Sequence, residues 1–283
     1  MVNLLIIKVF YDGTLFHGSQ RQPSLRTVEG EIIRVLNRLN INYGKLVASG
    51  RTDKGVHALS QVFMIELRGN SEDVAEDVVY KLSTELPEDI VLWAYRVVSF
   101  EFNPRFNANY RRYLYVKHVR EFNVEKAREI ARKFIGRHNF KCFSSFLYSN
   151  VPEFMEAERT VIAFNVFKMG NMVVYDISAN SFLRQMVRRI IPFIELYVRG
   201  KRSREDLDLA FKGICDVADV KLARPENLIL FDVDYFISFK VIPENMKRLR
   251  KYWLRKYSTH VVFRFLHDFV DFRYGKPFIK LAS

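Results

Sequence analysis

The first hundred residues alternate between short apolar runs and segments whose apolar residues recur at helical spacing. Residues 4–10 form a nearly continuous run of branched apolar residues, which is typical of a strand buried on both faces. From Thr27, a good helix-capping residue, apolar side chains recur every three or four positions as far as Leu39. The pattern continues with strands near 44–49, 60–68 and 90–98 and a helix near 72–85. This order of strand, helix, strand, strand, helix, strand predicts a split βαβ unit, an antiparallel sheet with both helices on one face.

A second, looser instance of the same order follows. It has predicted strands near 110–118, 160–168, 172–178 and 228–235, and predicted helices near 124–135 and 182–199. We therefore expect an α+β protein of two ferredoxin-like lobes, at residues 1–105 and 106–283, with a basic extension from about residue 236. A length of 283 residues suits two domains.

The charge of the chain indicates a polyanionic partner. Lys and Arg number 45 against 32 Asp and Glu, a formal net charge of +13. Residues 241–283 hold ten Lys and Arg against three Asp and Glu, so over half of this excess lies in the C-terminal tail. A basic surface that serves solubility alone is the less favoured alternative.

Pro243 suits the first turn of a helix in this tail. Helical spacing predicts an inward face at Met246, Leu249, Trp253 and Tyr257. The same spacing directs four cations toward solvent, where we expect them to contact phosphates: Arg248, Lys251, Arg255 and Lys256.

Cysteine and histidine spacing gives no case for a crosslink or a metal. Cys142 and Cys215 lie far apart without CxxC spacing, which argues against a disulfide framework and a zinc site. His260 and His267 are seven residues apart and lack nearby cysteine ligands. With neither a secretory leader nor a run of membrane-spanning length in the sequence, we expect a cytoplasmic protein without metal or membrane association.

A polar segment at residues 49–58 interrupts two apolar runs. Gly50 and Gly55 allow tight backbone turns, so the Asp53 side chain can be held at the head of a loop. A phosphate-binding P-loop is excluded, because Val56 and His57 follow the second glycine where that motif needs Lys and then Ser or Thr. Taken alone, such a segment is more often an ordinary turn.

The amino-acid sequence of this segment resembles that of the TruA-type tRNA pseudouridine synthases, as do several other motifs that occur in the same order as in that family. The segment itself is Gly50-Arg51-Thr52-Asp53-Lys54-Gly55-Val56-His57-Ala58. The other matching motifs are Tyr11-Asp12-Gly13, Gly18-Ser19-Gln20-Arg21-Gln22, Arg105-Phe106, Arg111-Arg112-Tyr113-Leu114-Tyr115, Ala179-Asn180 with Phe182, Met186-Val187-Arg188, and Leu228 to Tyr235. The resemblance covers residues 3–235.

The resemblance assigns three catalytic residues to a cleft between the lobes. Asp53 matches the family's catalytic aspartate. Arg188 matches the arginine that pairs with this aspartate across the cleft, and Tyr113 matches the tyrosine that stacks on the target base. Without the resemblance, Arg188 reads as a solvent-facing charge on a helix and Tyr113 as a core residue of a strand.

Four further residues are expected to bind the substrate. Arg51 fills or braces the gap that a flipped nucleotide leaves, and Leu230 lines the uracil pocket. Arg184, one turn before Arg188, extends the positive surface, and Arg111 belongs to the matching motif that contains Tyr113.

The resemblance implies isomerisation of uridine to pseudouridine in tRNA, at positions 38–40 of the anticodon stem-loop. This reaction needs no cofactor, and the carboxylate either attacks the sugar or relays a proton. Ser19 replaces a tryptophan common in bacterial members, and residues 117–124 lack an insertion that those members carry. A homodimer stays open. The alternatives are a non-catalytic RNA-binding protein on the same fold and a basic domain that binds polyanions by charge alone.

Pro192 falls inside the helix predicted near 182–199. Because proline has no N–H, the helical bond from residue 192 to the carbonyl of Arg188 is lost. We expect a kink there and a free Arg188 carbonyl; the kink either aims the Arg188 side chain at Asp53 or leaves the carbonyl to hold a water or an RNA hydroxyl, and the alternative is that Pro192 only fits the helix around the sheet.

Overall fold

The computed structural model describes residues 3–68, 72–145, 157–273 and 275–280. The chain divides into two units, one formed by Met1–Asn109 with Ile229–Ser283 and the other by Tyr110–Leu228. Each unit combines a mainly antiparallel sheet with helices, in agreement with the α+β prediction. None of the helices in the described residues combines the length and the hydrophobicity of a membrane-spanning segment.

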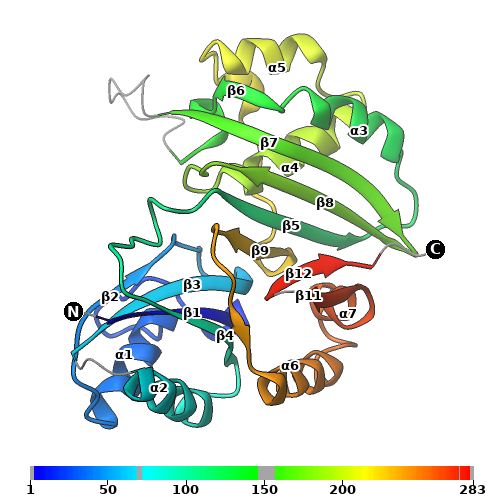
Figure 1. The fold of residues 1–283 in the computed structure, drawn as a ribbon. Helices are drawn as coiled ribbons and strands as arrows, with labels where there is room; N and C mark the ends of the chain where they lie inside the picture. The colour runs from blue at the N-terminus through cyan, green and yellow to red at the C-terminus, as the bar shows by residue number, and fades with distance from the viewer. Residues whose placement is uncertain (1–2, 69–71, 146–156, 274, 281–283) are drawn as a thin grey trace. The chain divides into compact units, whose positions relative to one another are not determined.

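The first unit begins with the predicted strand and helix order. Its N-terminal strands and α-helices are β1 (Asn3–Tyr11), α1 (Val28–Arg38), β2 (Tyr43–Ala48), β3 (His57–Leu67), α2 (Glu72–Glu85) and β4 (Ile90–Val98). Strand β1 pairs antiparallel with β3 and β4, and β2 pairs antiparallel with β3, so the order is β4-β1-β3-β2. Helices α1 and α2 cover the same face of this sheet (Figure 1). Thr27 is the N-cap of α1, where its side chain accepts from the Gly30 N–H.

The C-terminal segment completes the first unit, and this corrects the expected boundary. It contributes β9 (Leu228–Asp234), β10 (Lys240–Val241), α6 (Pro243–Arg255), α7 (Val261–Phe269), β11 (Val270–Arg273) and β12 (Lys276–Ile279). Strand β9 pairs parallel with the start of β3, β10 pairs with β4, and β11 pairs with β12. Residues 229–283 therefore belong with the first 109 residues rather than with one lobe at 106–283. The prediction failed because hydropathy indicates where a strand lies along the chain but not which strand it pairs with.

A buried ion pair ties β9 to the centre of this sheet. Lys8 Nζ on β1 lies 2.7 Å from Asp232 Oδ1 on β9, and both side chains are almost fully buried. The Lys8 ammonium also lies over the rings of Trp93 and Phe239. Burial raises the pKa of the Asp232 carboxyl despite the opposing effect of Lys8. Removing either charge would leave the other buried without its counterion.

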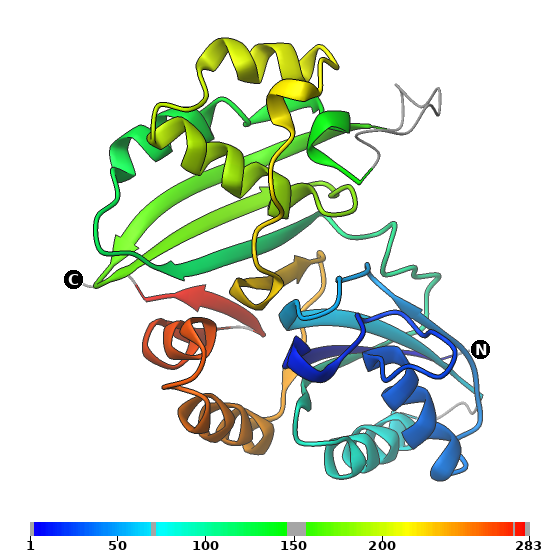
Figure 2. The ribbon, with the colours of Figure 1, turned by 180° about the vertical axis from the view of Figure 1, so that it is seen from behind.

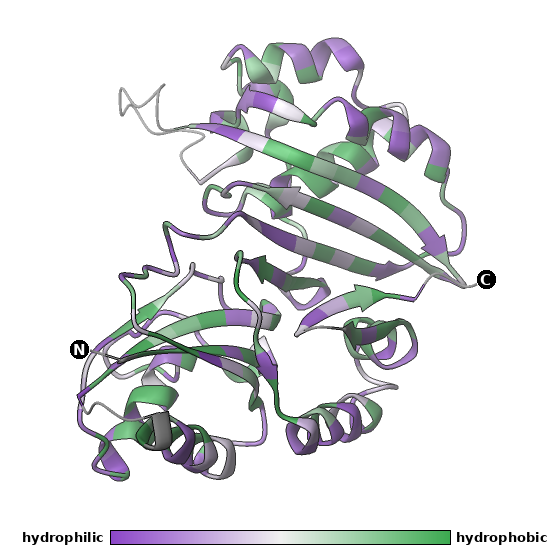
Figure 3. Cartoon of the chain, in the orientation of Figure 1, coloured by the Kyte–Doolittle hydropathy of each residue, from purple (hydrophilic) through white to green (hydrophobic). Residues whose placement is uncertain are grey.

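The second unit also has an antiparallel sheet, in the order β5-β8-β7-β6. Its elements are β5 (Tyr110–His118), α3 (Val124–Arg132), β6 (Gly136–Asn139), β7 (Glu158–Met169), β8 (Met172–Ala179), α4 (Met186–Val198) and α5 (Arg204–Phe211). Figure 3 shows that β7 is hydrophilic at its start and mainly hydrophobic along its middle, and Val161, Phe164, Val166 and Met169 of this strand are buried. Figure 2 shows α4 from behind the sheet, where its buried residues include Ile190, Phe193 and Ile194.

Helix α4 starts four residues later than predicted. Gln185, its N-cap, has a φ of 65°, in the left-handed region that an α-helix does not use. Phe182, which the sequence pattern placed in the helix, instead packs edge-on against Tyr113 with ring centroids 5.1 Å apart.

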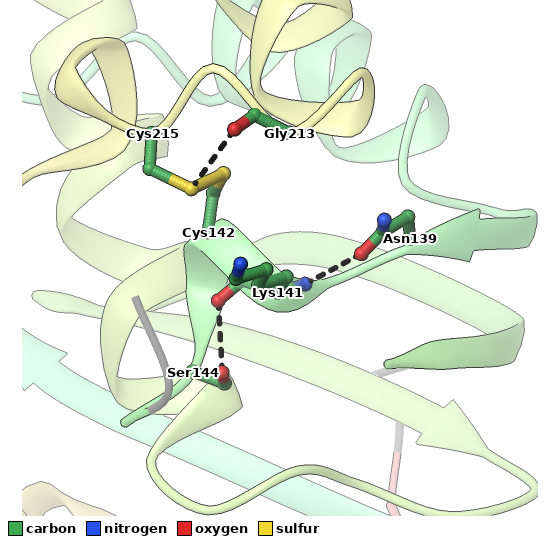
Figure 4. The surroundings of a disulfide bond; sticks show 6 residues. All are labelled: Asn139, Lys141, Cys142, Ser144, Gly213 and Cys215. Carbon is green, nitrogen blue, oxygen red and sulfur yellow. Dashed lines mark hydrogen bonds between the residues drawn. A yellow bond between two sulfur atoms is a disulfide. The ribbon is translucent and has the colours of Figure 1, made fainter. Parts of the chain in front are cut away.

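Cys142 and Cys215 form a disulfide, which contradicts the prediction of two isolated thiols (Figure 4). Cys142 lies in a short 3-10 helix, η2 (Lys141–Phe143), and Cys215 follows α5, with Cα atoms 4.8 Å apart. The ring of Phe211 at the end of α5 packs against Phe140 and Phe143. The spacing argument failed because aromatic packing joins two segments separated by 73 residues.

Candidate active site

The Asp53 loop, defined as residues 49–56, joins β2 to β3 and is anchored at Thr52. The Thr52 N–H donates to Ser19 Oγ over 2.9 Å, and the Ser19 N–H donates to the Thr52 carbonyl over 3.2 Å. The Tyr11 hydroxyl lies 2.7 Å from Thr52 Oγ1. Burial raises the pKa of Tyr11 to about 12, so this hydroxyl stays protonated near neutral pH. The residue beside Asp53 is therefore fixed through its backbone and its side chain.

Two glycines outside the loop allow the close approach that these bonds need. A Cβ at Gly13 would lie 2.1 Å from the Val56 carbonyl oxygen. A Cβ at Gly18, whose φ is +93°, would lie 2.9 Å from the Thr52 carbonyl oxygen. These distances explain why the Tyr11-Asp12-Gly13 and Gly18-Ser19 motifs accompany the Asp53 loop.

The glycines within the loop behave differently from each other. Gly55 has a φ of 81°, so the prediction of a turn that requires glycine is confirmed there. The same prediction is wrong at Gly50, whose φ is not positive and where a Cβ would meet nothing within 4 Å. The Gly50 carbonyl instead accepts from Gln61 Nε2 over 3.1 Å.

Asp53 lies at the turn that this anchoring creates. The Val56 N–H donates to the Asp53 carbonyl over 3.1 Å, and the Asp53 side chain is half-buried. Arg51, the predicted gap-filling residue, is exposed in the same loop. The loop thus brings Arg51 and Asp53 together, one exposed and the other half-buried.

A buried carboxylate and imidazole lie just beneath the loop. His57, the first residue of β3, has Nδ1 3.0 Å from the Gly13 N–H nitrogen and 3.2 Å from Asp12 Oδ1. Accepting from Gly13 needs the lone pair of Nδ1 and donating to Asp12 needs a proton there, so one nitrogen serves one contact at a time. Burial alone would raise the pKa of the Asp12 carboxyl, but its interactions with His57 and Thr14 outweigh this effect and hold the pKa well below its usual range.

Leu230 lies on β9, which pairs with β3 immediately after the Asp53 loop. Its Cα partner is Ala58, and its side chain is buried. The first unit therefore brings Leu230 near the end of the loop that carries Asp53.

In the second unit, Arg188 is held by a reciprocal contact with Ala223. The Ala223 N–H donates to the Arg188 carbonyl, and Arg188 Nε donates to the Ala223 carbonyl, each over 2.9 Å. Pro192 lies inside α4 as predicted. The expectation of a free Arg188 carbonyl is wrong, because the Ala223 N–H replaces the donor that Pro192 lacks.

Tyr113 and Arg111 lie two positions apart on β5, so their side chains share one face of the sheet. The Tyr113 ring packs against Phe182, and Arg111 Nη1 donates to the Asn180 carbonyl over 2.8 Å. On the opposite face, Arg112 pairs with Asp176 through two hydrogen bonds.

Arg184 precedes α4 and is exposed. Its carbonyl accepts from the Ser145 N–H over 3.1 Å. The prediction that it lies one helical turn before Arg188 is wrong, because the helix begins at Met186.

The four cations predicted to face solvent from α6 have different environments. Lys251 and Arg255 are exposed, and Arg255 pairs with Glu88 over 2.9 Å. Lys256 is half-buried near the ring of Tyr252. Arg248 is also half-buried and donates to the Ser83 carbonyl, so its predicted solvent-facing position is wrong.

The inward face of α6 agrees with the predicted stripe at Leu249 and Trp253 and differs from it at Met246 and Tyr257. Asn245, Leu249, Tyr252 and Trp253 are buried. Met246 and Tyr257 are half-buried instead. The hydropathy pattern did not predict burial of Asn245, because its amide is polar. The amide can be buried because its Nδ2 donates to the Leu92 carbonyl over 2.6 Å.

Sequence reasoning missed the residues that support the site. Tyr11, Asp12 and Ser19 were noted only as parts of motifs, and no role was given to His57 or Ala223. The signal for the first three was the recurrence of short Gly-containing motifs in front of the Asp53 loop. Nothing in the sequence pattern singles out Ala223, because its contribution is made through the backbone.

Comparison with known proteins identifies the family. Residues 130–236 match the family described as tRNA pseudouridine synthase. A protein of Pyrococcus horikoshii named tRNA pseudouridine synthase A is 34% identical over 262 residues, which cover 92% of this chain and 96% of that protein. The proteins of the same name from Pyrococcus abyssi and Thermococcus sibiricus are 38% and 36% identical and cover 87% and 88% of this chain, and 89% and 94% of their own lengths.

Among solved structures, the archaeal box H/ACA sRNP Nop10–Cbf5 complex aligns at 13% identity with a TM-score of 0.33, over 68% of this chain and 43% of that chain. That likeness is too weak to add to the argument. The sequence relationships are sufficient to assign the family, because they extend over nearly the whole chain. This chain therefore belongs to the TruA-type tRNA pseudouridine synthases, a family of isomerases that act on uridine in tRNA.

Proposed function

We propose that this chain converts uridine to pseudouridine at positions 38–40 of tRNA, with the Asp53 carboxylate as its catalytic group and without a cofactor. The observation that carries the proposal is the construction of the Asp53 loop. Ser19 and Tyr11 fix Thr52, and Gly13 packs closely against Val56, while Asp53 between them is half-buried. Such anchoring suits a side chain that must meet a reacting atom in one geometry.

The reaction moves one bond and leaves the composition of the nucleotide unchanged. The bond from ribose C1′ to uracil N1 breaks, the ring turns, and C5 bonds to the same ribose carbon. The C5 hydrogen then leaves as a proton, and N1 ends with a proton. A carboxylate at Asp53 serves this sequence either by attacking C1′ and leaving again, or by taking the C5 proton.

The family resemblance supplies the roles of the residues around the carboxylate. Arg188 pairs with the Asp53 carboxylate and keeps it ionised. Arg188 Nε donates to the Ala223 carbonyl, so we propose that Nη1 and Nη2 of the same guanidinium bind the Asp53 carboxylate. Tyr113, whose ring orientation is set by Phe182, stacks on the uracil.

The remaining predicted residues bind the RNA. Leu230 lines the uracil pocket, and Arg51 occupies the space that the flipped nucleotide leaves. Arg111 and Arg184 contact the neighbouring backbone, and the exposed cations of α6 contact more distant phosphates. The formal net charge of +13 supports this part of the proposal.

Mapping of pseudouridine in a tRNA transcript tests the proposal. The protein is incubated with transcript and no added cofactor, and pseudouridine is located by carbodiimide modification and primer extension. We expect stops at positions 38–40 wherever uridine occurs there, and their loss in a transcript with cytidine at those positions.

Pseudouridine elsewhere in the transcript would contradict the positional proposal. Tight tRNA binding without any pseudouridine would instead favour a non-catalytic RNA-binding protein. Binding of heparin and tRNA with equal affinity, again without pseudouridine, would favour a domain that recognises polyanions by charge alone.

A further inference from the structure

The hydroxyl of Tyr252 brings one polar atom of the C-terminal helix α6 into the apolar core of the first unit. Tyr252 is buried, and its ring packs edge-on against Phe10 and Phe263, with centroids 5.6 and 5.9 Å away. Its hydroxyl donates to Asp12 Oδ2 over 2.7 Å. Burial and the Asp12 carboxylate both raise the pKa of Tyr252, so the hydroxyl remains a donor.

Asp12 joins this hydroxyl to the turn that follows β1. Oδ2 accepts from Tyr252, while Oδ1 accepts from the N–H and the hydroxyl of Thr14 over 3.0 and 2.5 Å. The Asp12 N–H donates to the Asp89 carbonyl over 3.0 Å. A buried carboxylate with donors on both oxygens has little freedom to rotate, so Tyr252 helps to fix the turn at residues 12–14.

That turn in turn contacts the Asp53 loop. The Gly13 N–H nitrogen lies 3.0 Å from His57 Nδ1, and Gly13 sits so close to Val56 that a methyl group would not fit between them. Val56 is hydrogen-bonded to the Asp53 carbonyl. A shift of the turn would therefore pass directly into the backbone that carries Asp53.

We propose that Tyr252 is a positioning residue for Asp53, acting through the Asp12 carboxylate and the contact of Gly13 with His57 and Val56. The inference rests on the proposed function of Asp53. By this proposal the C-terminal extension helps to position Asp53, in addition to providing basic charge. The contrasting reading is that the hydroxyl only satisfies a buried carboxylate and contributes to stability alone.

The substitution Tyr252→Phe separates these readings, because it removes the hydroxyl and keeps the ring. A positioning role predicts a kcat for pseudouridine formation that is lower by about tenfold, the usual scale for a buried hydrogen bond to a charged group, with KM within about twofold. A purely structural role predicts a lower unfolding temperature with unchanged kcat and KM for the folded enzyme.

Tyr257→Phe is the matched control. Tyr257 lies in the same C-terminal segment and also donates to an aspartate, Asp268, over 2.7 Å. Asp268 is a residue of α7, and none of its described contacts is with the Asp53 loop. We expect its kcat and KM to match those of the wild-type enzyme.

A double-mutant cycle with Asp12→Asn tests the route of the effect, and it remains informative if one single variant is poorly stable. If Tyr252 acts through Asp12, Tyr252→Phe lowers kcat less in the Asp12→Asn background than in the wild-type background. Equal decreases in both backgrounds would overturn the proposed route. An unchanged kcat in Tyr252→Phe would overturn the positioning role, whereas a wild-type enzyme without activity would contradict the proposed function itself.

Discussion

The Asp53 loop and the segment around Arg188 hold their predicted catalytic side chains in different ways. Thr52, beside Asp53, is bound by the side chains of Ser19 and Tyr11. Arg188 is bound by the backbone of Ala223, which meets both its carbonyl and its Nε. Ordinary substitutions should therefore weaken the Asp53 loop readily, whereas the Arg188 segment should tolerate changes that leave its backbone in place.

Among the substitutions that test this difference, Gly13→Ala is expected to cause the largest loss of kcat. The added methyl group would lie 2.1 Å from the Val56 carbonyl oxygen, so the loop must move. A displacement of about 1 Å at a reacting group is enough to lower the rate about 100-fold, and we expect at least that loss of kcat. Gly50→Ala is the control, because its methyl group meets nothing within 4 Å. Similar losses in both variants would show that close approach at Gly13 is not the cause.

Ser19→Ala is expected to have the second-largest effect. It leaves the buried Thr52 N–H without its acceptor at Ser19 Oγ, at a cost of about 1–3 kcal/mol in the free energy of unfolding. Urea unfolding measures this cost, and kcat should fall as well. The exposed Ser258 provides the control substitution Ser258→Ala, which should change stability by less than about 0.5 kcal/mol. Equal stability of the two variants would remove Ser19 from the anchoring of the loop.

Pro192→Ala is expected to have the smallest effect on activity. The new N–H can compete with Ala223 for the Arg188 carbonyl, but the bond from Arg188 Nε to Ala223 stays in place. We expect a higher free energy of unfolding, because proline is unfavourable inside a helix, and a kcat lowered by less than about threefold. Pro243→Ala at the first turn of α6 is the control, since a proline there removes no helical bond. A tenfold loss of kcat in Pro192→Ala would show that the proline itself orients Arg188.

Much of the fold could be predicted from the sequence because its elements have strong local signals. The bounds predicted for α2, β4 and β5 agree with the structure, and Thr27 caps α1 as expected. The assignment of residues 229–283 to the first unit could not be predicted in the same way, because it depends on which strand β9 and β10 join. The disulfide was missed for a related reason, since only tertiary packing brings Cys142 to Cys215.

Sequence motifs predicted the functional side chains of the site. They did not predict the contacts that backbone groups make with those residues. Asp53 and Arg51 lie together in one loop, and Tyr113 and Arg111 share one face of β5. The satisfied carbonyl of Arg188 was not foreseen, because its donor belongs to a backbone group 35 residues away. Arg248 was misplaced because amphipathic spacing marks a helix face without showing that α2 lies against it.

The rate of tritium release from tRNA labelled at uridine C5 tests the central claim most directly, because forming the bond from C5 to the ribose carbon displaces the C5 hydrogen. Asp53→Asn removes the carboxylate charge with little change in shape, and Asp77→Asn removes an equivalent charge from the surface of α2, where Asp77 pairs with Lys81. We predict release by the wild-type enzyme and by Asp77→Asn without any added cofactor. For Asp53→Asn we predict no release above background, with a tRNA dissociation constant within about threefold of the wild type. Release by Asp53→Asn at the wild-type rate, or a loss of tRNA affinity as large as the loss of rate, would contradict the assignment of Asp53 to the chemistry.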